Sequence, residues 1–94
     1  MSIEDKFNSV NDDYCKFEKV EDKKSSRPDI HAFMLLDCIF ESSGRDIVAA
    51  ESHDVIYLEP SGEEISKLSS DQVLELTRCG VMYDSENDCL SMFV

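Results

Sequence analysis

Residues 69–94 read SSDQVLELTRCGVMYDSENDCLSMFV and decide the second half of the fold. Ser69 and Gln72 have the spacing of a capping box, in which each side chain bonds the backbone N–H of the other residue. The apolar residues that follow predict a helix over about 70–79, and Gly80 supplies the left-handed residue that ends such a helix. Two strand-like segments then flank the turn SEND, which predicts a C-terminal β-hairpin.

The alternation of side chains predicts the register of this hairpin. If Asp84 pairs with Cys89, the remaining pairs are Tyr83 with Leu90, Met82 with Ser91 and Val81 with Met92. One face of the hairpin then carries Val81, Tyr83, Leu90, Met92 and Val94. The other face carries Met82, Asp84, Cys89, Ser91 and Phe93.

A second helix is predicted over residues 28–43. Ser26 is the expected N-cap, Pro28 suits the first turn, and Gly44 is the expected stop. The run from 32 to 40 is almost wholly apolar, which predicts burial on more than one side of this helix.

The segment between the two helices predicts one or two strands and a helical turn. The run VIYL at 55–58 is typical of a buried strand, whereas 46–50 is compatible with a strand or a helical turn. Ser61 and Glu64 have capping-box spacing and predict a short turn that carries Ile65 and Leu68 inward.

These elements predict one small α+β domain over residues 28–94. Residues 1–27 are polar, but their apolar members Phe7, Val10, Tyr14, Phe17 and Val20 recur at helical spacing. Two interpretations therefore stay open for 1–27, a polar tail and an amphipathic helix that docks on the domain.

The charge of the chain is strongly negative and unevenly distributed. The formal net charge is −12, and residues 31–94 hold 13 acids and only three bases. Nucleic acids and anionic membranes are themselves negative, so this charge argues against direct binding to them and favours a basic protein partner. Solubility alone also accounts for such a charge. The start MSIEDKFNSV lacks the pattern of a signal peptide, and we expect a cytoplasmic protein.

The four cysteines predict neither a metal site nor a disulfide. They are Cys15, Cys38, Cys79 and Cys89, and they form no C-x-x-C pair. In the predicted register Cys79 and Cys89 lie at opposite ends of the ladder, beyond the Cα separation of about 7 Å that a disulfide tolerates. We expect reduced thiols that pack as small apolar side chains, and no cofactor.

The hairpin turn begins like a calcium-binding loop. Asp84, Glu86 and Asp88 alternate as in an EF-hand, but the sixth position holds Cys89 where the motif needs Gly. The printed sequence also has no residue at the twelfth position, where the motif needs Glu. The prediction is an acidic hairpin tip without a calcium loop.

An enzyme hypothesis rests on His53, which lies between Glu51 and Asp54. An acid–histidine cluster can tune a general base. The motifs G-x-S-x-G, S-x-x-K and H-E-x-x-H do not occur in the sequence. We therefore expect a turn histidine bonded to its neighbours, and no catalytic residue.

Eight carboxylates are candidate partner-binding residues. Three follow the predicted strand, at Glu59, Glu63 and Glu64. Two, Asp71 and Glu75, lie one turn apart on the predicted helix, and three, Asp84, Glu86 and Asp88, lie in the hairpin turn. Duplex DNA displays a phosphate about every 3.4 Å along each strand, so a row of carboxylates can mimic nucleic acid. The favoured function is a non-catalytic acidic regulator or inhibitor of a basic, nucleic-acid-binding protein. The alternative is an assembly protein that forms a homo-oligomer through the 28–43 helix and the hairpin.

The block HDVIYLEPSGEEISKLSSDQVLELTRCGVMYDSENDCLSMFV resembles short uncharacterised proteins of bacteriophages and prophages. The likeness lies in an acidic apolar strand, a capped helix that ends in Cys-Gly-Val, and a terminal hairpin. It covers under half of the chain and assigns no functional residue. The resemblance implies an accessory protein that inhibits or modulates a host factor.

Overall fold

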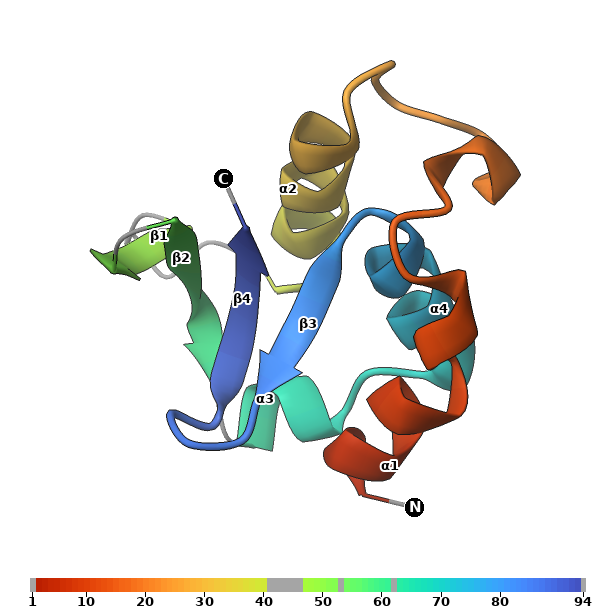
Figure 1. Cartoon of the computed structure of the whole chain (residues 1–94). Coiled ribbons are helices and arrows are strands. Elements are labelled where there is room, and N and C mark those ends of the chain that lie inside the picture. The colour runs from red at the N-terminus through yellow and green to blue at the C-terminus, as the bar shows by residue number, and fades with distance from the viewer. Residues whose placement is uncertain (1, 41–46, 53, 62, 94) are drawn as a thin grey trace.

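Helices pack on one side of a four-stranded antiparallel sheet (Figure 1). The computed structural model describes residues 2–40, 47–52, 54–61 and 63–93. The strands are β1 (Val48–Ser52), β2 (Val55–Ser61), β3 (Val81–Asp84) and β4 (Cys89–Phe93), in the order β1-β2-β4-β3. The helices are α1 (Ile3–Ser9), α2 (Pro28–Ile39), α3 (Glu63–Ser66) and α4 (Ser70–Arg78). Two 3-10 turns, η1 (Asn11–Asp13) and η2 (Phe17–Lys19), follow α1. The predicted α+β class is confirmed.

The C-terminal half of the chain forms as its sequence predicts. Ser69 Oγ accepts a hydrogen bond from the Gln72 N–H at 3.1 Å, and Gln72 Oε1 accepts from the Ser69 N–H at 2.8 Å. Gly80 has a φ of +94° and follows the end of α4. The ladder between β3 and β4 pairs Asp84 with Cys89, and the three other predicted pairs are confirmed.

The segment before α4 contains both predicted strands and the predicted helical turn. β1 pairs antiparallel with β2 and begins at Val48, so the strand interpretation of this segment is the correct one. Ile65 in α3 and Leu68 after it are fully buried, as predicted. The Ser61 side chain, and with it the predicted cap of α3, lies outside the described part of the chain.

α2 differs from its prediction at both ends. Its N-cap is Arg27, not Ser26, because a proline keeps the preceding residue extended and the helix begins at Pro28 itself. The helix ends at Ile39, and Phe40 is extended and packs half-buried against the core. The predicted stop at Gly44 lies outside the described residues.

α2 is buried over a wide arc but leaves one stripe of its surface open. His31, Ala32 and Leu36 are buried, whereas Ile30 and Met34 are each 41% exposed. Phe33, Leu35 and Ile39 also pack partly buried against the core, so the predicted burial on more than one side is confirmed except along the stripe of Ile30 and Met34. This stripe shows two large apolar side chains to solvent.

Residues 2–27 pack against the core without forming one long helix. The continuous helix predicted by the spacing of residues 7–20 does not form, because α1 ends at Ser9 and separate 3-10 turns follow. Asn and Asp, which occupy positions 11–13, have low intrinsic propensity for helix interiors. Phe7 and Val20 are nevertheless buried in the same cluster as the side chains of α4 and β4.

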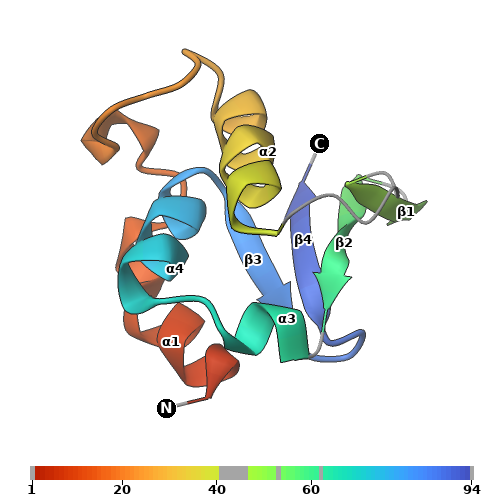
Figure 2. The same cartoon turned by 180° about the vertical axis from the view of Figure 1, so that it is seen from behind.

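The core lies between the helices and one face of the sheet, as Figure 2 shows from behind. This inner face carries Ile56, Leu58, Val81, Tyr83, Leu90 and Met92. Opposite residues of antiparallel strands share a face, so the other side of the sheet is also defined. We call it the outer face, and its residues are Val55, Tyr57, Met82, Asp84, Cys89, Ser91 and Phe93. The two faces predicted for the hairpin are confirmed for residues 81–84 and 89–93, and Val94 lies outside the described residues.

Candidate functional site

Carboxylates from three segments of the chain meet at one end of the molecule. The β3–β4 turn, α3 and the start of α1 lie at the lower end of both Figure 1 and Figure 2. Ser61 pairs with Cys89, which brings α3 beside the hairpin turn. The Phe7 and Tyr83 rings are stacked 6.3 Å apart, which brings α1 there too. We call this region the acidic end, and it comprises Glu4, Asp5, Glu63, Glu64, Asp84, Glu86 and Asp88.

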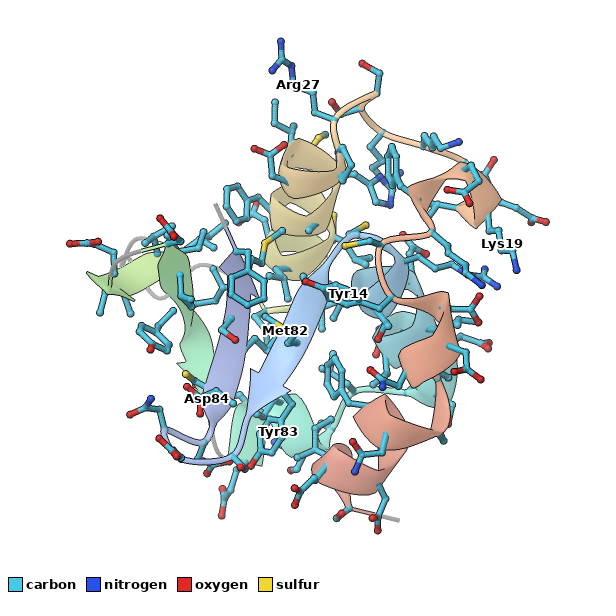
Figure 3. All side chains as sticks on the ribbon, in the orientation of Figure 1. Tyr14, Lys19, Arg27, Met82, Tyr83 and Asp84 are labelled. Atoms are coloured by element: carbon cyan, nitrogen blue, oxygen red, sulfur yellow. The ribbon has the colours of Figure 1, made fainter. Side chains whose placement is uncertain are left out.

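Most of these carboxylates are open to solvent, whereas many of the bases lie elsewhere. Every member of the acidic end except Asp84 is exposed, and the nearest bases in sequence are Lys6 and Lys67. Figure 3 shows Lys19 and Arg27 at the opposite end of the molecule from Asp84. The residues from 16 to 27 hold Lys16, Lys19, Lys23, Lys24 and Arg27. Glu18, Glu21 and Asp22 lie in the same stretch, so five bases against three acids give it a net charge of +2. The acidic end therefore lies apart from these bases, with no compensating positive charge of similar size.

Two carboxylates of the acidic end hold the hairpin turn. Asp84 Oδ1 accepts from the Glu86 N–H at 2.9 Å, and Asp84 Oδ2 accepts from the Asn87 side-chain amide at 2.8 Å. The bond from the Asn87 side chain, with those from the backbone, lowers the pKa of Asp84. Tyr83 Oη donates to Asp88 Oδ1 at 2.7 Å, and this bond raises the pKa of Tyr83 to about 12. The turn therefore fixes its own charges in place.

The acidic end includes five of the eight predicted partner-binding residues: Glu63, Glu64, Asp84, Glu86 and Asp88. Asp71 and Glu75 lie elsewhere, where they line a hollow of about 410 Å³ with Val20, Asp22 and Arg78. The backbone of Glu59 belongs to β2, but its side chain lies outside the described part of the chain. Sequence reasoning missed Glu4 and Asp5, because only the tertiary fold brings α1 to the hairpin.

Glu75 has a buried partner that sequence reasoning also missed. His31 Nε2 lies 2.6 Å from Glu75 Oε2, and His31 Nδ1 accepts from the Lys24 N–H at 3.1 Å. A nitrogen that accepts a backbone N–H carries no proton, so the neutral ring holds its proton on Nε2 and donates it to Glu75. The His31 side chain is 1% exposed.

This histidine–glutamate pair is arranged for structure rather than for catalysis. A general base needs a nitrogen within reach of its substrate, and both nitrogens of His31 are engaged inside the protein. The Phe17 ring also packs edge-on against the imidazole, with 5.7 Å between ring centroids. The residue of the enzyme hypothesis, His53, lies outside the described residues.

The cysteines are all free thiols. Cys79 and Cys89 are buried, whereas Cys15 and Cys38 are exposed. Burial raises the pKa of Cys79 to about 12 and also raises the pKa of Cys89. Across the described ranges, no group of three or more His, Cys, Asp or Glu side chains is placed to hold a metal ion.

Comparison of the chain with protein-family models, with curated proteins and with solved structures finds no match. The resemblance to bacteriophage and prophage proteins therefore stays a prediction. Within the described residues, every helix is too short or too polar to cross a membrane.

Proposed function

We propose that this chain is a small acidic binding protein without catalytic activity, which regulates or inhibits a basic protein. The observation that supports the proposal is the convergence of exposed carboxylates from α1, α3 and the hairpin at the acidic end. A field of one sign steers a partner of the opposite sign and raises its association rate. The bases between residues 16 and 27 lie away from this end, so they screen it little.

A nucleic-acid-binding protein is the basic partner that this surface suits best. Such a partner carries a groove that is adapted to a row of negative charges. The acidic end would occupy that groove and exclude nucleic acid from it. If the resemblance to phage accessory proteins holds, the partner is a host factor.

The test uses a synthetic lysine- and arginine-rich peptide as the basic probe, with binding measured by titration calorimetry. Charges interact over a Debye length of about 30 Å at 0.01 M salt but of only about 10 Å at 0.1 M. We expect binding at low salt that weakens at least about tenfold over this range, and displacement of the protein from the peptide by duplex DNA.

A pair of matched variants separates the acidic end from the general charge of the chain. The first carries Glu63→Gln, Glu64→Gln and Glu86→Gln, and we expect it to bind the peptide several-fold more weakly. The second removes the same charge at three other exposed positions, through Asp12→Asn, Glu18→Gln and Asp37→Asn. If the two variants lose affinity equally, the acidity only solubilises the chain and the proposal is wrong.

A second candidate function is assembly into a homo-oligomer. Ile30 and Met34 on α2 favour it, because large apolar side chains exposed on one helix face are typical of an interface. Light scattering over a range of concentrations tests this candidate, and a strict monomer would exclude it.

A further inference from the structure

The outer face of the sheet carries the large apolar side chains of Val55, Tyr57, Met82 and Phe93, with Asp84 at its turn end, and no described helix covers it. Figure 1 shows β3, β4 and β2 from this side, and in Figure 3 the Met82 side chain lies on the ribbon without a helix in front of it. Phe93 is 61% exposed, which is unusual for an aromatic ring on a central strand. None of Val55, Tyr57, Met82 and Phe93 belongs to the core or packs against it. These residues therefore form a separate apolar surface.

The side chains of the outer face are arranged in rows across the strands. Val55 lies opposite Phe93, and Ser91 lies between Tyr57 on β2 and Met82 on β3. Adjacent strands are about 4.8 Å apart, so Tyr57 and Met82 flank the small Ser91 at a spacing of about 10 Å. An α-helix with its side chains is about 10 Å wide. A helix along β4 would contact both flanking residues and cover Phe93.

The negative charges around this face favour a partner that carries positive charges. The sequence holds no Lys or Arg from 46 to 66 or from 79 to 94, which includes all four strands. Carboxylates flank the apolar residues at the turns that join the strands, at Asp54 in the β1–β2 turn and at Asp84, Glu86 and Asp88 at the β3–β4 turn. A second copy of this chain would bring like charges together at such a face, whereas a partner with a basic rim would be attracted.

We infer that the outer face is the docking site for an amphipathic helix of the partner, apolar on one side and flanked by Lys or Arg. This inference rests on the proposed function, because it specifies which structural element the basic partner presents. A helix is one of the elements that cover an apolar sheet face, and the opposite face of this same sheet is covered by helices. The contact supplies the specificity that charge alone lacks, since burial of Phe93, Tyr57 and Met82 depends on shape.

The test compares two synthetic peptides of identical Leu and Lys composition. In one the leucines have helical spacing and form one apolar face, and in the other the order is scrambled. We expect the amphipathic peptide to bind about tenfold more tightly, the ratio that burial of one large apolar side chain would give. In NMR titrations, the largest amide shifts should occur at Tyr57, Ser91 and Phe93.

Two matched variants locate the contact. Phe93→Ser should abolish the preference for the amphipathic peptide, whereas Met34→Ser, at an apolar residue 41% exposed on α2, should preserve it. An unchanged thermal midpoint shows that each variant is folded. Equal binding of the two peptides, or an equal loss in both variants, would overturn the inference.

The remaining outcomes separate this inference from the proposed function. If the scrambled peptide binds as well as the amphipathic one, the acidic protein still binds basic partners but the outer face does not select a helix. If neither peptide binds at low salt, both the inference and the proposed function fail. If Phe93→Ser abolishes a concentration-dependent self-association instead, a second copy is the occupant and the inference is wrong.

Discussion

At the scale of single residues, the bond between His31 and Glu75 is the contact whose loss we expect to matter most. Replacement of Glu75 by Leu removes the acceptor and leaves the His31 Nε2–H buried without a partner. Such an unsatisfied donor costs about 1–3 kcal/mol. We therefore expect the free energy of unfolding, measured by urea denaturation, to fall by about this amount.

Two further variants attribute that loss to the hydrogen bond. Glu75→Gln keeps an acceptor oxygen and should cost less than Glu75→Leu. In a His31→Phe background the change from Glu75 to Leu should cost little, because the donor is already gone. If Glu75→Leu is equally costly in both backgrounds, the bond does not stabilise the fold and the prediction is wrong.

Cys79 gives a prediction about pH. Burial raises its pKa to about 12, whereas a thiol in an unfolded chain ionises near about 8.5. Between these values the unfolded chain releases a proton that the folded chain keeps, so stability falls as pH rises. Below this window both states are protonated and no stability is lost. Urea denaturation from about pH 7 to about pH 10.5 should show this decline.

The control for the pH prediction is a comparison of two thiols. Cys79→Val should make the decline shallower, whereas Cys38→Ser, at an exposed thiol, should leave it unchanged. The decline will not vanish, because Cys89 and Tyr83 also have raised pKa values. Stability that does not change over this range would contradict the burial of Cys79.

Some site residues bond to near neighbours in the sequence and others to distant residues, and only the first kind could be predicted. The Asp84 turn could be predicted, because all of its bonds lie within three residues. The bond between His31 and Glu75 spans 44 residues, and no local pattern connects them. The one available signal was the position of His31 directly before Ala32 in an apolar helix, which is compatible with burial but names no partner.

At the scale of elements, α4 depends on its N-terminal cap. Ser69→Ala removes the hydroxyl that accepts the Gln72 N–H, and loss of such a cap costs about 1 kcal/mol. Ser69→Asp keeps an acceptor and adds a negative charge at the positive helix end, so it should be nearly neutral. Urea denaturation of the two variants tests this, and equal stability would show that the cap contributes nothing.

Most elements with local signals were predicted correctly, apart from the N-cap of α2, whereas features that depend on tertiary contacts were missed. The register of β3 and β4 follows from side-chain alternation, which is a property of neighbouring residues. The end of α2 at Ile39 was missed, because the half-buried packing of Phe40 takes the chain out of the helix and is not visible in the sequence. The sequence left a polar tail and a docked helix open for residues 1–27, and the structure shows a third arrangement, in which α1 ends at Ser9 and two 3-10 turns follow on the core.

At the scale of the whole molecule, the sheet has two different roles on its two sides. The inner face joins α4 and residues 2–27 in one core, and it accounts for the stability of the fold. The outer face adds nothing to that core and lies in a region without Lys or Arg. The hairpin register predicts that Met82 and Phe93 share a face beside the acidic turn, but only the strand order shows that Val55 and Tyr57 of β2 extend this face.

The net charge of −12 also predicts how stability depends on salt. Folding brings the carboxylates closer together, and their repulsion destabilises the compact state. Salt screens this repulsion, so the free energy of unfolding should rise between about 0.01 M and about 0.5 M NaCl.

The variant with Glu63, Glu64 and Glu86 changed to Gln should be more stable at low salt, and its free energy of unfolding should respond less to added salt. Its matched control with Asp12, Glu18 and Asp37 neutralised should respond more like the original chain, because those carboxylates lie outside the acidic end. A fall in stability with salt would instead mean that ion pairs such as Lys19–Asp13 outweigh the repulsion.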